Sequence, residues 1–177
     1  CVWGNYEFLP YDLNGSDLDI VVKDSNKTIF KSILNDSLIK FNGKIISYFN
    51  TKYSEHYRII GVYKGIAWGI MIDVIYEEFY YKGKVYIPAN WIWNFTKKHN
   101  DIYVNQLGFS YLAGFLKELL HNTTIKDKYF LNAILEIKKT PQEYESFIRD
   151  VYGDYFYNLL LLEFNKSKEK INLKLLR

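Results

Sequence analysis

The chain of 177 residues has a globular composition, with 49% hydrophobic and 24% charged residues, which excludes a disordered or collagen-like protein. Its 23 lysines and arginines barely outnumber its 20 acidic residues and are scattered, so a nucleic-acid partner is disfavoured. One cysteine excludes an internal disulfide, and the three histidines lack metal-ligand spacing. No apolar run approaches the roughly 20 residues of a transmembrane helix, and no signal peptide is visible. We therefore expect a cytoplasmic protein without a membrane span.

Strand and turn signals dominate the first half of the chain. Four strands are predicted there, at residues 18–22, 44–49, 57–63 and 66–75. Apolar residues at helical spacing predict a helix over 26–41, and Asn42 with Gly43 forms its C-terminal stop signal. A hairpin turn is expected at residues 64–65, and a second hairpin is expected within residues 77–87.

Helical patterns dominate the second half. Helices are predicted from about residue 110, at 129–138, from 141 onward and at 155–176. Pro141 suits the first turn of its helix, and Thr140 suits the capping position before it. Because the strands come first and the helices later, the sequence predicts an α+β protein. We expect a mixed sheet in residues 1–90 and a helical C-terminal subdomain in residues 91–177.

Two aspartates stand at the entrance of the first strand. Asp17 and Asp19 are two residues apart, so a strand would present both on the same face. Adjacent carboxylates repel each other unless a cation compensates. Carboxylate oxygens are hard ligands that favour Mg²⁺ or Mn²⁺. The non-functional alternative is that the two aspartates are solvated residues at the end of a strand.

A third aspartate lies inside an apolar strand. Asp73 is flanked by isoleucine and valine, and an acid is costly to bury there without a partner. If this strand lies beside the strand of Asp17 and Asp19, three carboxylates meet. Such a set can hold two divalent cations about 3.5–4 Å apart, as in phosphoryl or nucleotidyl transfer. An ion-paired strand acid is the structural alternative. Arg58 is a further candidate, either for a phosphate or sugar contact or for a cross-strand ion pair.

The spacing of these pieces resembles the nucleotidyltransferase superfamily that includes DNA polymerase beta. The resemblance is closer still to bacterial nucleotidyltransferase-like proteins associated with capsule and surface-polysaccharide genes. It rests on an apolar-glycine element, a loop, an Asp-apolar-Asp strand entrance, an apolar-Asp-apolar strand and a later helical stretch. These pieces are residues 2–5, 9–16, 17–20, 72–74 and 119–129.

That resemblance implies a nucleotidyltransferase-like mixed sheet with flanking helices, Mg²⁺ (or Mn²⁺) as cofactor, and a nucleoside triphosphate as substrate. It makes Asp17 and Asp19 metal ligands, and it makes Asp73 the third ligand and a candidate general base. A small hydroxyl or phosphate acceptor, such as a sugar or polyol phosphate, is implied as the second substrate.

Residues implied to contact the nucleotide are more dispersed. Gly4 and Asn5 stand where the superfamily usually has Gly-Ser or Gly-Gly, and Ser16 is an alternative phosphate contact. Lys126 and Lys128 are candidates to neutralise the triphosphate from the helical half, because phosphates need cations beyond the metals. A solvated lysine face is the alternative for these two lysines.

Two other functions fit the same residues. A nucleotide-sugar glycosyltransferase also uses an Asp-x-Asp to bind metal, but its apolar strand usually precedes the motif, whereas here the apolar residues follow it. A catalytically degenerate nucleotidyltransferase fold that serves as a binding domain is the second alternative. The sequence identifies neither the base, the acceptor nor the oligomeric state.

Overall fold

The computed structural model describes residues 1–4, 6, 9, 17–121 and 126–166. The chain divides into two compact units, one made of residues 1–80 and 96–105 and the other of residues 81–95 and 106 onward. Helices and a mixed sheet both occur, which confirms the expected α+β class. No helix among these residues has the length and apolar content needed to cross a bilayer.

The first unit is built on a four-stranded sheet with strand order β1-β4-β3-β2. Its strands are β1 (Leu18–Val22), β2 (Gly43–Asn50), β3 (Ser54–Tyr63) and β4 (Ile66–Tyr76). The strand β1 runs parallel to β4, whereas the β3–β4 and β2–β3 pairs are antiparallel. Lys64 and Gly65 both have positive φ, as a two-residue hairpin turn with the twist of the flanking strands requires.

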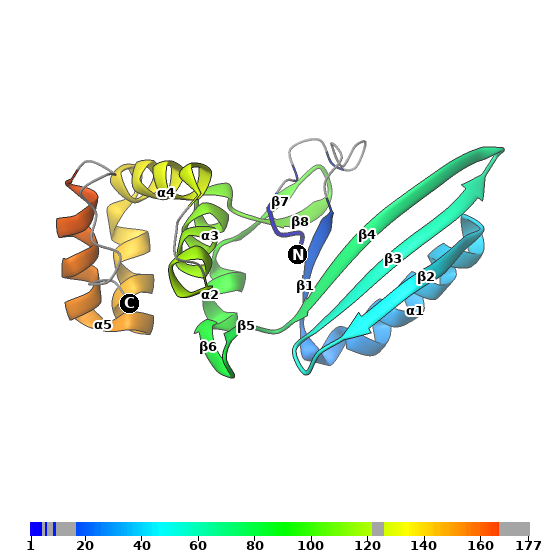
Figure 1. Cartoon of the computed structure of the whole chain (residues 1–177), viewed down its shortest axis with the longest axis horizontal. Helices are drawn as coiled ribbons and strands as arrows, with labels where there is room; N and C mark the ends of the chain where they lie inside the picture. The colour runs from blue at the N-terminus through cyan, green and yellow to red at the C-terminus, as the bar shows by residue number, and fades with distance from the viewer. Residues whose placement is uncertain (5, 7–8, 10–16, 122–125, 167–177) are drawn as a thin grey trace. The chain divides into compact units, whose positions relative to one another are not determined.

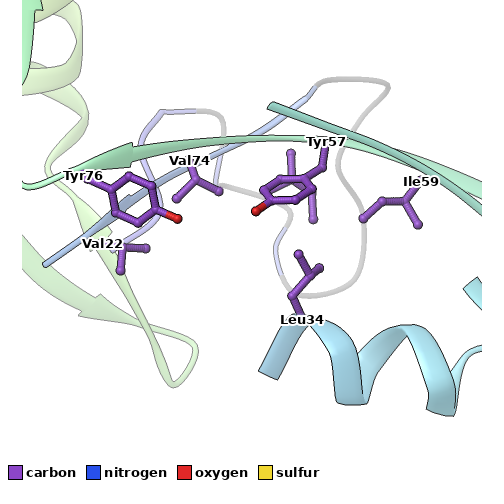
Figure 2. Close-up of a cluster of buried hydrophobic side chains, with 7 residues drawn as sticks. Val22, Leu34, Tyr57, Ile59, Val74 and Tyr76 are labelled. Carbon is purple, nitrogen blue, oxygen red and sulfur yellow. The ribbon is translucent and has the colours of Figure 1, made fainter. Parts of the chain in front are cut away.

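Helix α1 (Lys27–Lys40) covers one face of this sheet after a short 3-10 turn, η1 (Asp24–Asn26) (Figure 1). Leu34 is the buried residue of the helix and lies below the strand residues Tyr57 and Ile59 (Figure 2). Ile72, Val74 and Tyr76 of β4 and Val22 of β1 belong to the same cluster. Since side chains alternate along a strand, every second residue of β3 and β4 faces α1.

The N-terminal segment extends the sheet beyond β1. Val2 forms an antiparallel bridge with Ile20 and a parallel bridge with Val104. It therefore links β1 to β8 (Ile102–Asn105), which pairs with β7 (Thr96–His99). The β7–β8 hairpin was not predicted from the sequence. Its turn at Asn100 and Asp101 has two positive φ values without glycine, so the usual Gly signal is absent.

The second unit is mainly helical. It contains β6 (Lys84–Ile87), α2 (Ala89–Asn94), α3 (Leu107–His121), α4 (Asp127–Lys139) and α5 (Pro141–Phe164), and the short strand β5 (Phe79–Tyr81) spans the point in the sequence where the first unit ends. Pro141 stands in the first turn of α5 as predicted. Thr140 occupies the N-cap position as predicted, but its side chain makes no capping hydrogen bond, because the hydroxyl donates back to the Glu136 carbonyl (3.5 Å). Gly153, with φ of 84°, interrupts α5 just before the predicted helix at 155, whose residues 167–176 lie outside the described part.

Candidate functional site

The face of the sheet opposite α1 carries a row of polar side chains. Asp19 of β1 is the register partner of Asp73 of β4, and Asp73 is in turn the partner of His56 in β3. Neighbouring strands lie about 4.8 Å apart. The row alternates with the core-facing residues Ile72 and Tyr57, so its side chains project to the other side of the sheet. The strand of Asp73 therefore lies beside the strand of Asp19.

Asp17 directly precedes β1 and is exposed. The nearby Trp3 amide donates to the Asp19 carbonyl (2.9 Å), so Gly4 follows a segment that is paired with β1. Gly4 has a φ of 63°, a left-handed conformation that suits glycine. Asn5 and Ser16, which are also expected to contact the nucleotide, lie outside the described residues.

Asp73 is partly exposed and has a hydrogen-bonding partner. These two features explain how an apolar strand can contain an aspartate. Its side chain is 34% exposed because α1 covers the opposite face. The Nδ1 atom of His56 lies 2.8 Å from Asp73 Oδ1, within hydrogen-bond distance. The Nε2 atom of the same ring lies 3.0 Å from the Ser54 hydroxyl. Asp73 is thus an anchored carboxylate at a half-exposed position.

The sequence did not single out the His56–Asp73 pair, although it contains the signal for it. A two-residue turn at 64–65 pairs Tyr63 with Ile66, and counting seven residues away from the turn along each strand brings His56 opposite Asp73. The cross-strand ion pair that the sequence suggested for Arg58 does not follow from this register, because Arg58 lies opposite Met71.

Glu55 is adjacent in sequence but belongs to the other face. It is 3% exposed and accepts hydrogen bonds from the hydroxyls of Tyr57 (2.5 Å) and Tyr76 (2.6 Å), with Lys31 Nζ 2.9 Å away. Burial raises the pKa of Glu55, but the hydrogen bonds from Lys31 and the two tyrosines outweigh it and lower the pKa to about 2. The Glu55 carboxylate thus has its hydrogen-bonding partners within the core, and its contacts stabilise the fold.

The two lysines proposed to contact phosphate lie in the second unit. Lys126 precedes α4 and is exposed, with its Nζ atom 3.7 Å from Glu118 Oε1. Lys128 is exposed in the first turn of α4, with its Nζ atom 6.0 Å from the centre of the Tyr129 ring. Both ammonium groups are accessible to an anion.

The donor set on the open face fits a hard divalent cation in its chemistry. Asp19 and Asp73 supply carboxylate oxygens from adjacent strands, and Asp17 is one residue outside β1. Within the described part of the chain, the side chains as they stand form no group of three or more His, Cys, Asp or Glu arranged to hold a metal ion. The cross-strand pair Asp19–Asp73 is thus the part of the expected constellation that the strands bring together.

Comparisons with known proteins add little to this picture. No protein-family model matches the sequence. No curated protein matches it either. Among solved structures, the chain is similar to the crystal structure of JHP933 from Helicobacter pylori, with a TM-score of 0.42 and 12% sequence identity over 94% of this chain and 73% of that chain. A likeness at this level carries no argument about function.

Proposed function

We propose that the protein is a metal-dependent nucleotidyltransferase that transfers a nucleoside monophosphate from a nucleoside triphosphate to a small hydroxyl or phosphate acceptor. A sugar or polyol phosphate is the acceptor class that the sequence resemblance suggests, with surface-polysaccharide biosynthesis as its setting. The observation that carries the proposal is the register of the parallel β1–β4 pair. It sets Asp19 beside Asp73 on the face that α1 leaves open.

In this proposal Asp17, Asp19 and Asp73 would hold Mg²⁺, which neutralises the triphosphate and activates the acceptor oxygen. The acceptor oxygen forms a bond to the α-phosphorus, the bond from that phosphorus to the bridging oxygen breaks, and pyrophosphate leaves. The carboxylate of Asp73 takes the acceptor's proton. Lys126 and Lys128 are the proposed counter-charges for the phosphates, a role that their exposure allows.

The test is a thermal-shift panel of each common nucleoside triphosphate, with and without Mg²⁺. A ligand at about 100 times its Kd stabilises a protein by roughly 2.7 kcal/mol, which raises Tm by several degrees at this chain length. We expect a Mg²⁺-dependent shift in the wild type that is lost in the double variant Asp17→Asn/Asp19→Asn. Asp36→Asn is the matched control, because Asp36 is an exposed acid on α1, and it should retain the shift.

The same panel separates the alternatives. An unchanged triphosphate shift in the double variant would reject the proposed site. A shift with nucleotide-sugars but with no triphosphate would favour a glycosyltransferase. A flat panel on folded protein would favour a degenerate domain that binds another partner.

A further inference from the structure

A chain of hydrogen bonds leads from the β2–β3 turn to Asp73. The amides of Tyr53 and Ser54 donate to Thr51 Oγ1, over 3.1 and 3.0 Å. Thr51 Oγ1 lies 2.8 Å from Ser54 Oγ, which lies 3.0 Å from His56 Nε2. On the far side of the ring, His56 Nδ1 lies 2.8 Å from Asp73 Oδ1. Every contact in the chain has the length of a normal hydrogen bond.

The contacts at the two ends of this chain favour one direction for its hydrogen bonds. A carboxylate oxygen accepts hydrogen bonds, so the contact with Asp73 Oδ1 favours a proton on His56 Nδ1. In a neutral imidazole Nε2 is then an acceptor, and the Ser54 hydroxyl must donate to it. At the other end, Thr51 Oγ1 already accepts two amide protons, so its own proton has two acceptors in reach, Ser54 Oγ at 2.8 Å and the Ser54 carbonyl at 3.4 Å. The shorter of the two contacts favours the arrangement in which Ser54 Oγ accepts from Thr51 and donates to His56.

We propose that His56 is a positioning residue for Asp73, held in its Nδ1–H tautomer by Ser54 and Thr51. This inference deepens the proposed function and rests on it, because the role of His56 is to fix the carboxylate that would bind the metal. The imidazole engages Oδ1 and so fixes the rotation of the carboxylate. Hydrogen-bonding partners of this kind typically change metal affinity by about 10–100-fold when they are removed.

The same three residues also have the connectivity of a serine nucleophile with its base and orienting acid. The surroundings of Ser54 disfavour that reading. A nucleophilic serine needs nearby amide donors for the oxyanion, whereas the amides of Tyr53 and Ser54 both donate to Thr51. The Ser54 hydroxyl is itself fixed between Thr51 and His56. These contacts favour an anchoring role for Ser54.

The first experiment examines the tautomer without any metal. Long-range ¹H–¹⁵N correlations of the imidazole ring, recorded on the full chain near neutral pH, distinguish a protonated Nδ1 from a protonated Nε2. The His56 signal is assigned by its loss in His56→Asn. We expect the Nδ1–H tautomer, and Ser54→Ala should increase the population of the other tautomer. A ring protonated at Nε2 in the wild type would overturn the proposal.

The second experiment measures Mn²⁺ affinity at constant neutral pH in the wild type and in variants of equal polarity. Asparagine places its amide near the position of Nδ1 and can still donate to Asp73, whereas the longer glutamine places it near Nε2. We therefore expect His56→Gln to bind Mn²⁺ roughly 10-fold more weakly, and His56→Asn to stay closer to the wild type than to the glutamine variant. A purely structural role would affect both variants alike.

Asp73→Asn distinguishes a failure of the proposed metal site from a failure of the proposed role of His56. If this variant binds Mn²⁺ as the wild type does, the proposed metal site fails, and the tautomer measurement stands on its own. If Asp73→Asn loses affinity while His56→Gln keeps it, the metal site stands and the role of His56 is wrong. A burst of product from p-nitrophenyl acetate that Ser54→Ala abolishes would make Ser54 a nucleophile and would also overturn the positioning role.

Discussion

Glu55 and His56 are consecutive residues of β3 with opposite surroundings. Glu55 points into the core under α1, where Tyr57, Tyr76 and Lys31 bind its carboxylate. His56 lies on the open face, where its Nδ1 atom is 2.8 Å from Asp73 Oδ1. A shift of one residue in register would exchange these two surroundings. The charge on each side of the sheet is therefore fixed by the strand register.

The acid stability of the first unit should depend on Glu55. Its pKa in the folded protein is about 2, below the ordinary value of 4.5. A lowered pKa stabilises the fold fully above the unfolded value, and this contribution is lost as the pH falls from about 4.5 toward 2. At neutral pH, Glu55→Gln should lower the free energy of unfolding by about 1–3 kcal/mol, and the deficit should shrink as the pH falls through that range.

Urea unfolding curves measured across this pH range provide the test, with Asp36→Asn as the control for an exposed carboxylate. If the free energy of unfolding depends on pH in the same way in the wild type and in Glu55→Gln, Glu55 is not the cause of the acid sensitivity.

At the level of elements, one aromatic ring, that of Trp68, packs closely against glycines of the neighbouring strands. The Trp68 indole donates to the Phe41 carbonyl (3.1 Å) and lies over two glycines. A Cβ added at Gly61 would meet ring atoms of Trp68 at 2.5 Å, and one at Gly43 would meet them at 2.8 Å. The Trp68 ring therefore occupies the space that a side chain at either glycine would need.

Gly61→Ala should therefore destabilise the protein by about 1–3 kcal/mol, which is the usual cost of overpacking. Gly69→Ala on the partner strand is the matched control, because the nearest atom to its added Cβ is 3.5 Å away, an ordinary contact. The control should be neutral or slightly stabilising, since glycine weakens a strand interior. Chemical denaturation of both variants checks this pair. Equal stability of the two would contradict the steric account.

At the level of the whole molecule, each unit has its own buried cluster. The first is formed by the sheet and α1. In the second, Phe147 is fully buried and packs its ring against Phe109 at 5.0 Å and Trp91 at 5.6 Å. The chain passes between the units more than once, because residues 81–95 and 96–105 belong to different units.

Separate clusters predict separate responses to a cavity. Phe147→Ala should cost the second unit about 3–5 kcal/mol, since the ring is fully buried. Amide hydrogen exchange should then show lost protection in α3 and α5, while β3 and β4 keep theirs. Equal loss of protection in both units would instead show that they unfold as one cooperative body.

Several elements could be predicted from the sequence because their determinants are local. The strand at 18–22 was located to the residue, and the helix over 26–41 and the hairpin at residues 64–65 nearly so. Their signals are apolar periodicity and turn residues, which act over a few positions. The hairpin β7–β8 lacked such signals, since its turn contains no glycine.

The sequence by itself determined the α+β class, the main strands and the three aspartates as candidates, because residue type and spacing carry that information. Only the tertiary structure decided that β1 lies parallel to β4, which places Asp19 beside Asp73, since a parallel pair is joined by a long connection that local signals do not encode. Only the structure decided, too, that α1 covers the Glu55 face and leaves the Asp73 face open. Which side of a sheet is buried depends on where the helix packs.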